Sequence, residues 1–420
     1  MNMSKRLLLS LWIMTFAAAA VPLRAQITVE EYRLAVADYS WSLQQARSQS
    51  RQAQASMARA RTGYLPALSA TGAFTQTFRK FSGLEPWTSL VRPQIEQTVY
   101  GGGAVEADYR QAQLAYDITL CTEQTSWFDV RYSADYAYWS LSRAENYLRA
   151  MRDYVKIVGS LQQVVHRRFE EGYIAKSDVL QIDSRMSDAE YQLVAAERLH
   201  EVALHNFNIM CGDEVEREVT LAQSILDTIE QPRRMSMSEI TVRRPDFTAS
   251  RMRIDAAQWG VKTVRAAYLP KVSVGVYGAW QPYTPNSTGK TYVDGGAYLS
   301  LSVPIFHFRE RSHAVLAARQ VVRQSELQSA ELYDTILREE IDGWTDLMSA
   351  HAQMLSSQQS LGLAAENLEI STYSYGEGLA TILDVMQAQI SWLQIYTNAI
   401  TAQFNYAVAV ASYARITSMP

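Results

Sequence analysis

The sequence predicts an α+β membrane protein in which long antiparallel helices are joined to four amphipathic strands. Three observations support this fold class. The chain carries the same plan twice, it contains two long stretches without proline (residues 94–231 and 305–419), and each half contains segments in which apolar and polar residues alternate. Such proline-free stretches far exceed an ordinary globular helix and indicate a coiled coil or a helical stalk.

The two halves are related by a tandem duplication. The segment Tyr64-Leu65-Pro66 returns as Tyr268-Leu269-Pro270, 204 residues later. The pattern that contains Gly172 and Asp178 returns with Gly378 and Asp384, 206 residues later. Short motifs that keep nearly one offset in the same order indicate a structural repeat.

The first residues of the chain indicate export. Residues 1–25 have a basic start (Lys5 and Arg6), an apolar stretch and a plausible cleavage point after Ala25, as in a secretory signal. Nothing after residue 26 resembles an apolar transmembrane helix. The formal net charge is −4 and no basic patch suggests a nucleic-acid partner. We therefore expect residues 26–211 to form a first repeat, 212–244 an equatorial or linker region, and 245–420 a second repeat.

Each repeat is expected to contain a β-hairpin, at about residues 67–100 and 270–304. Val272, Val274 and Val276 alternate with small or polar residues, and the other three segments follow the same period of two. Turn-rich loops at 82–86 and 282–289 would join the strands. Ten residues at about 3.3 Å, tilted by about 45°, cover roughly the hydrocarbon thickness of an outer membrane.

Each repeat is also expected to contain a helical hairpin, at about residues 103–210 and 307–416. Apolar residues alternate in steps of three and four, which is the heptad pattern of helices packed side by side. One such stripe alone would also fit an amphipathic helix on a globular core. The two stripes consist of Val179, Ile182, Met186, Ala189, Leu193 and Ala196, and of Leu337, Ile341, Trp344, Met348 and Leu355.

Four strands cannot close into a membrane barrel, because open edges would leave backbone groups unpaired in lipid at several kcal/mol each. If the strands enter the membrane, several chains must share one barrel. Their helices would then form a common hollow cylinder, or tunnel. The fold class is therefore a long antiparallel coiled-coil tunnel with a transmembrane β-barrel shared between chains.

The chain resembles the TolC-type outer membrane efflux proteins (outer membrane factors) over essentially all of its mature length. The resemblance rests on the two Tyr-Leu-Pro segments, on Val99-Tyr100-Gly101-Gly102 and Val303-Pro304-Ile305-Phe306 after the strands, and on the two glycine turns. It implies a homotrimer with four strands per chain, in the outer membrane of a Gram-negative bacterium and extending into the periplasm. It also implies a passive exit duct that works with a periplasmic adaptor and an inner-membrane pump of RND or ABC type, without a cofactor.

The resemblance assigns a pore constriction to Asp384 and Gln387, which follow the second turn. Three Asp384 carboxylates around one axis would attract cations and oppose anions. Gln387 stands where the family pattern has a second acid, and Ala380 where it has an arginine latch. Asp178 and Tyr375 are then the candidates for a gate or latch, although Asp178 also fits a helix-capping acid.

The turns themselves are expected to touch the adaptor. Glycine at these positions also has a plain structural reason, since tight turns between helices often need positive φ. The residues assigned to adaptor contact are Gly172, Tyr173, Gly378 and Leu379.

The sequence contains no motif of an enzyme. The histidines lack metal-ligand spacing, the Gly101–Gly103 run is not followed by the residues of a phosphate loop, and no nucleophile motif is present. Export of drugs or other small toxic compounds is the favoured function. Type I protein secretion, metal efflux and a periplasmic coiled-coil scaffold that forms no channel are the alternatives.

Overall fold

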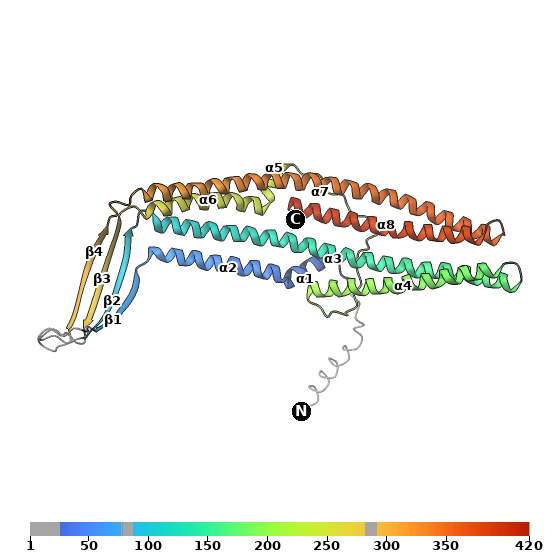
Figure 1. Cartoon of the computed structure of the whole chain (residues 1–420), viewed down its shortest axis with the longest axis horizontal. Helices are drawn as coiled ribbons and strands as arrows, with labels where there is room; N and C mark the ends of the chain where they lie inside the picture. The colour runs from blue at the N-terminus through green and yellow to red at the C-terminus, as the bar shows by residue number, and fades with distance from the viewer. Residues whose placement is uncertain (1–25, 77, 79–86, 282–291, 420) are drawn as a thin grey trace, which may run out of the picture. The chain divides into compact units, whose positions relative to one another are not determined.

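The computed structural model describes residues 26–76, 78, 87–281 and 292–419, in the order of elements shown in Figure 1. The expected export signal (1–25) and the expected loops at 82–86 and 282–289 lie outside the described residues. Among the helices that are described, none combines the length and the apolar character needed to cross a membrane.

The chain divides into two compact units, and each unit draws on both halves of the sequence. The two long helices, α3 (Ala104–Glu170) and α7 (Glu310–Gly376), contribute residues to both units. The compact units thus differ from the sequence repeats, because each unit contains equivalent pieces of both. The hairpin unit comprises the described residues of 1–40, 128–234 and 340–420, and the sheet unit those of 41–127 and 235–339.

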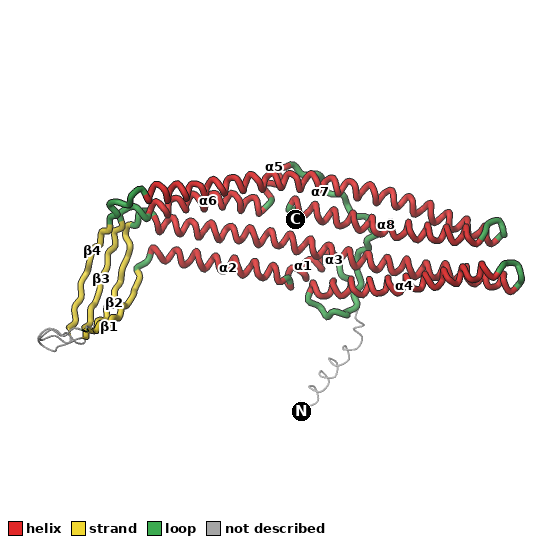
Figure 2. The backbone as a smooth tube through the Cα atoms, in the orientation of Figure 1, coloured by secondary structure: helices red, strands yellow, loops and turns green. Residues whose placement is uncertain are grey.

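The hairpin unit contains two helical hairpins, in which α3 turns into α4 (Lys176–Cys211) and α7 turns into α8 (Ile382–Thr417), as Figure 2 shows. A shorter helix, α1 (Val29–Tyr39), packs on α4, where Tyr32 stacks on Phe207 with ring centroids 3.8 Å apart. The prediction of very long antiparallel helices is confirmed. At 1.5 Å per residue, the 67 residues of α3 or α7 extend about 100 Å.

Helix α7 begins three residues later than position 307, where the sequence pattern suggested a start. Phe308 and Arg309 have φ angles of 39° and 69°. A right-handed helix cannot include this left-handed backbone conformation, so α7 can begin only after these residues.

The apolar seam predicted on α4 is confirmed, since Val179, Ile182, Ala189 and Ala196 are buried. The seam predicted on α7 differs. Its members Ile341, Met348 and Leu355 are 46%, 40% and 47% exposed within the single chain, whereas the neighbouring Leu347 is fully buried. Heptad spacing identifies a stripe that packs against another helix, but it does not say whether that helix belongs to the same chain.

The sheet unit combines a four-stranded sheet with shorter helices. All four predicted strands are present, and they pair in the order β1-β2-β3-β4, each antiparallel to the next. The elements are α2 (Trp41–Arg61), a 3-10 turn (Thr62–Tyr64), β1 (Ala67–Gln76), β2 (Trp87–Tyr100), α5 (Met237–Arg243), α6 (Pro245–Ala266), β3 (Lys271–Gln281) and β4 (Tyr292–Ser302).

The sheet has one apolar and one polar face, as the alternating sequence predicts. Leu68, Ile95, Val276 and Ala297 lie side by side across the four strands on the apolar face. Large apolar side chains of this face are exposed, and Leu68 is 75% exposed. The polar face carries interacting side chains: the Tyr298 hydroxyl donates to Glu96 Oε2 at 3.1 Å, and the Arg92 guanidinium lies 4.8 Å from the Tyr277 ring centroid.

Candidate functional site at the two helical turns

The two helical turns have the same backbone geometry. In the first, Gly172 N–H donates to Phe169 O at 3.0 Å and Tyr173 N–H donates to Arg168 O at 2.9 Å. In the second, Gly378 and Leu379 repeat this pair of bonds. These are the two bonds of a helix-ending Schellman motif, which requires a left-handed residue. Gly172 and Gly378 supply it, with φ angles of 78° and 75°.

The residues that follow these glycines present apolar side chains to solvent. Tyr173 is 77% exposed and Leu379 is 82% exposed. In a Schellman motif this position commonly packs back on its own helix. Exposure at both turns leaves the two side chains available to another molecule, and their contact with an adaptor stays a prediction.

The two turns lie together within the hairpin unit (Figure 1), and one buried cluster joins all four long helices there. The helices α3 and α4 contribute Val165 and Ile182, while α7 and α8 contribute Tyr375 and Val385. The two hairpins therefore share a core next to their turns. The buried members are Tyr154, Val158, Leu161, Val165, Val179, Ile182, Ala189, Tyr375, Ile382 and Val385.

The expected constriction residues begin helix α8. Thr381 is the N-cap, and its hydroxyl and backbone N–H both donate to Asp384 Oδ2, at 2.7 Å and 2.8 Å. Asp384 N–H donates back to the Thr381 hydroxyl at 3.4 Å, which completes a capping box. The side-chain bond from Thr381, followed by the backbone bond, lowers the pKa of Asp384. Asp384 is therefore held ionised by its own helix N-terminus.

Asp384 and Gln387 lie one helical turn apart and are both exposed in the single chain. The Gln387 Nε2 amide donates to Ser391 Oγ at 3.4 Å, one turn further along α8. Nothing within the described residues covers either side chain. Both groups are thus available to a pore, and their convergence around an axis stays a prediction.

The equivalent position in the first hairpin is built differently. Helix α4 begins after Ala175, which has no side-chain oxygen to cap it. Asp178 is only half-buried, and the one hydrogen bond described for its carboxylate comes from the Ser177 hydroxyl, at 3.3 Å. The sequence suggested helix capping as an alternative role for Asp178 and a pore role for Asp384, whereas the capping box lies on Asp384. The pattern Thr381-x-x-Asp384 was the sequence signal for it.

Tyr375 contacts a residue that the sequence did not single out. The Arg168 guanidinium of α3 lies 4.7 Å from the Tyr375 ring centroid, and Arg168 NH2 donates to Gly376 O at 2.7 Å. Tyr375 itself is buried, and its hydroxyl has no hydrogen-bond partner within the described residues. Arg168 thus joins the end of one hairpin helix to the end of the other.

A second polar contact joins the two helices of the first hairpin. His166 Nε2 and Gln162 Nε2 of α3 lie 2.9 Å and 2.7 Å from Asp183 Oδ1 of α4. The hydrogen bonds from His166 and Gln162 lower the pKa of Asp183. Within the described ranges, no group of three His, Cys, Asp or Glu side chains is placed to hold a metal ion.

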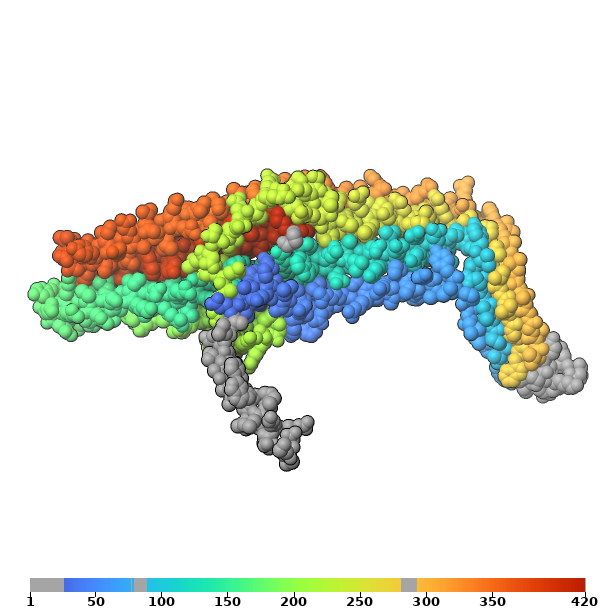
Figure 3. All heavy atoms as spheres, turned by 180° about the vertical axis from the view of Figure 1, so that it is seen from behind, coloured from blue at the N-terminus to red at the C-terminus, as the bar shows by residue number. Residues whose placement is uncertain are grey.

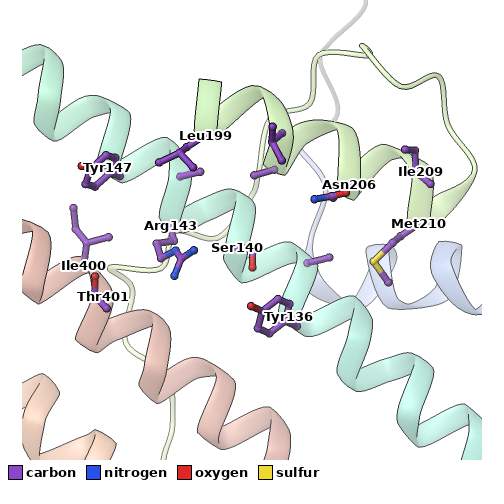
Figure 4. Close-up of a pocket in the computed structure, with 14 residues that line it drawn as sticks. Tyr136, Ser140, Arg143, Tyr147, Leu199, Asn206, Ile209, Met210, Ile400 and Thr401 are labelled. Carbon is purple, nitrogen blue, oxygen red and sulfur yellow. The ribbon is translucent and has the colours of Figure 1, made fainter. Parts of the chain in front are cut away.

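A cavity of about 580 Å³ lies elsewhere in the hairpin unit, between α3, α4 and α8 (Figure 4). Tyr136, Ser140, Arg143 and Tyr147 of α3 form one of its walls. The Arg143 guanidinium lies 4.2 Å from the Phe404 ring centroid. The lining mixes aliphatic, aromatic and polar side chains with one cation, which suits packing between helices as well as a ligand.

The arrangement of two long helical hairpins and a small antiparallel sheet is the fold of tunnel-forming outer-membrane channels. The solved structure of VceC from Vibrio cholerae superimposes with a TM-score of 0.77 at 17% identity, covering 93% of this chain and 95% of that one. The chain belongs to the outer membrane efflux protein family, whose sequence model matches residues 36–207 and 237–417. The resemblance noted from the motifs is thereby confirmed.

Two curated relatives come from Pseudomonas aeruginosa. The pyoverdine export outer membrane protein OpmQ is 28% identical over 362 residues, covering 81% of this chain and 74% of its own length. The alkaline protease secretion protein AprF is 24% identical over 268 residues, covering 59% of this chain and 53% of its own length. The chain thus spans about half of AprF. Family membership makes it a protein of the Gram-negative outer membrane with a periplasmic extension, as predicted.

Proposed function

We propose that three copies of this chain form a passive duct through the outer membrane. The observation that carries the proposal is the sheet, which has one apolar exposed face and two open edges, β1 and β4. Unpaired strand edges are costly in lipid, and pairing β1 of one chain with β4 of the next removes every edge. Repetition of this head-to-tail contact around an axis closes a ring, and three chains supply twelve strands.

The helices support the same assembly. Ile341, Met348 and Leu355 form an exposed apolar stripe on α7, and Tyr191 and Val202 belong to a second one on α4. Large apolar stripes on long helices indicate helix partners outside the chain. Neighbouring copies in a closed ring would cover both stripes and form the wall of a periplasmic tunnel. In this proposal each sequence repeat supplies one β-hairpin and one helical hairpin, and residues 212–244 form an equatorial belt.

The exported compounds are small molecules in this proposal. OpmQ, whose match extends over most of both chains, is described as a pyoverdine export protein, whereas the match to the secretion protein AprF is shorter. The duct requires neither a cofactor nor catalysis. Substrate choice and energy come from an inner-membrane pump and its periplasmic adaptor. The adaptor docks on the turns at Gly172–Tyr173 and Gly378–Leu379, whose exposed side chains suit a contact.

Fractionation tests the assembly. The full chain, expressed with its natural leader, is expected in detergent extracts of the outer membrane as a trimer that dissociates on heating. Those trimers should conduct ions in planar bilayers. Recovery as a soluble periplasmic protein without conductance would reject the duct and favour the coiled-coil scaffold. A conducting trimer that exports a protein rather than a small compound, when paired with its adaptor and pump, would instead assign type I secretion.

The constriction is tested within the same trimers. We propose that Asp384 lines the narrowest point, with Gln387 one turn further along, and that Asp178 and Tyr375 take part in closing it. Asp384→Asn should then reduce the cation preference of the pore, because each of three converging carboxylates loses its charge. Asp178→Asn removes an acid assigned to closing rather than to the constriction, so it should alter how often the pore opens and leave the cation preference unchanged. Equal selectivity in all three proteins would remove Asp384 from the pore lining.

A further inference from the structure

Helices α6 and α7 of the sheet unit lie antiparallel in a fixed register. Arg244 NH1, at the start of α6, bonds to Glu339 Oε2 at 2.6 Å. Six residues further along α6, Ser250 Oγ lies 3.0 Å from Ser329 Oγ. Between these two contacts the residue number rises on α6 and falls on α7, so the helices run in opposite directions. The end of α6 therefore lies beside the early turns of α7 (Figure 3).

A groove of about 320 Å³ lies between these helices near the end of α6. Val261 is buried and Val322 half-buried, and together they give the groove an apolar floor. Four of the six exposed side chains around this floor are basic. The complete lining is Gln258, Val261, Lys262, Arg265, Arg319, Val322, Arg323 and Glu326.

The charges around the groove are not balanced. Glu326 is the single acid of the lining, and it pairs with Arg323 at 2.9 Å. Lys262 Nζ lies 3.4 Å from the centroid of the Trp259 ring, which does not neutralise it. Arg265 and Arg319 have no ion pair with any residue that the structure describes. Like charges gathered at one groove repel each other, and an anion between them relieves that repulsion.

We propose that the groove between α6 and α7 binds the phosphate headgroup of an anionic phospholipid. Two arginines can each offer a planar pair of N–H donors to phosphate oxygens, which is the geometry that phosphate recognition uses. The valine floor suits the first carbons of the lipid rather than a fully hydrated ion. The lipid source is favoured because Arg265 lies six residues before β3 begins.

The position follows from the proposed duct, on which this inference rests. If the strands span the membrane, the ends of the helices that join them lie at the periplasmic headgroup layer, which is roughly 5–8 Å deep on each side. Lys262 and Arg265 lie within about 6 Å of the end of α6 at 1.5 Å per residue. Basic side chains at this depth are typical of sites that hold anionic lipids.

Native mass spectrometry of the full chain in detergent tests the site. Phosphatidylglycerol should remain bound to the wild type. Phosphatidylcholine, which is zwitterionic and carries no net charge, should bind at least tenfold more weakly. The double variant Arg265→Gln/Arg319→Gln should bind phosphatidylglycerol about 30-fold more weakly, the loss expected for two basic side chains at a membrane surface. Arg251→Gln/Arg253→Gln removes two exposed arginines from the same helix outside the groove and should bind like the wild type.

Three results would overturn the assignment. Equal binding of both lipids by the wild type would show that charge is not recognised, and this comparison needs no variant. Equal loss in both double variants would indicate general attraction to the basic helix. Displacement of the lipid by millimolar inorganic phosphate would assign the groove to a soluble anion. Planar-bilayer conductance of Arg265→Gln/Arg319→Gln should stay normal, so a failure of the lipid site and a failure of the duct are distinguishable.

Discussion

The two helical turns share one sequence pattern but make different contacts with the buried core. In the second hairpin, Tyr375 and Ile382 are buried and Thr381 caps helix α8. The residues 206 positions earlier are Phe169, which is 40% exposed, and Lys176, which is also exposed. Ala175, at the position of Thr381, gives no cap.

This difference teaches that backbone geometry and local stability are separate properties of a repeated motif. Both turns keep the same glycine and the same pair of backbone bonds. At the positions compared, only the second turn has buried apolar side chains and a capping box, and its helix end also accepts the Arg168 contact. We therefore expect the second turn to open less often than the first. Hydrogen exchange of peptides from each turn measures that difference directly.

Replacing the buried isoleucine should have the largest effect. Ile382→Ala removes a side chain from the shared core and should lower the free energy of local opening by roughly 2–4 kcal/mol, or a 30- to 1,000-fold faster exchange around the second turn. Lys176→Ala, at the equivalent exposed position, should change it by less than about 0.5 kcal/mol. Equal effects at the two positions would contradict the asymmetry.

Removing the contact between the hairpins should have the second-largest effect. Arg168→Ala removes the bond to Gly376 O and the cover of the Tyr375 ring, at a cost of about 1–2 kcal/mol to the second turn. Hydrogen exchange of the backbone amides that follow Tyr375 should then be about five- to 30-fold faster. The neighbouring exposed arginine provides the control, and Arg167→Ala should leave the second turn unchanged. If both variants behave alike, the contact contributes nothing to this turn.

Exchanging the caps should reverse part of the difference. Thr381→Ala removes the N-cap of α8 and should lower the free energy of local opening by about 1 kcal/mol. Hydrogen exchange in the first turn of α8 should then be about fivefold faster. Ala175→Thr places a hydroxyl at the uncapped start of α4 and should slow exchange there by a similar factor. The pair of variants thus tests one contact in both directions. No gain from Ala175→Thr would mean that the first turn cannot adopt the capped geometry.

The sequence predicts the periodic features well. Alternation predicted which residues of one strand share a face: Val272, Val274 and Val276 lie on one face of β3, opposite apolar residues of β4. The heptad pattern identified the buried stripe of α4 through Ile182 and Ala189. These predictions succeed because a side chain's direction depends on local periodicity alone.

The sequence predicts contacts between distant segments poorly. Arg168 lies 208 residues from Gly376, and no spacing rule relates them. Likewise, heptad spacing on α7 marked Ile341 as a packing residue but could not show that it is exposed in a single chain. The capping box of Asp384 differs from both, because Thr381 three residues earlier was a local signal.

The smallest change should come from protonation of Asp384 at the second turn. Its bonds to Thr381 lower the pKa of Asp384 in the folded chain. This contribution to stability is therefore fully present above the ordinary carboxyl pKa of about 3.9, and is lost as the pH falls through the lowered folded value. At neutral pH, Asp384→Asn should exchange faster than the wild type at the start of α8. The ratio of the two rates should approach one once the carboxylate is protonated.

Taking the ratio at each pH removes the intrinsic pH dependence of exchange and the titration of every other carboxylate, because both proteins share them. Asp178→Asn gives the comparison for the first turn. Its carboxylate is bonded only to the neighbouring Ser177 in the contacts described and does not cap α4, so substitution should alter the start of α4 less than Asp384→Asn alters the start of α8. A ratio that stays constant from neutral pH to pH 3 would show that the Asp384 charge does not stabilise the cap, and would leave Tyr375, Ile382 and the Thr381 hydroxyl as the sources of the difference between the turns.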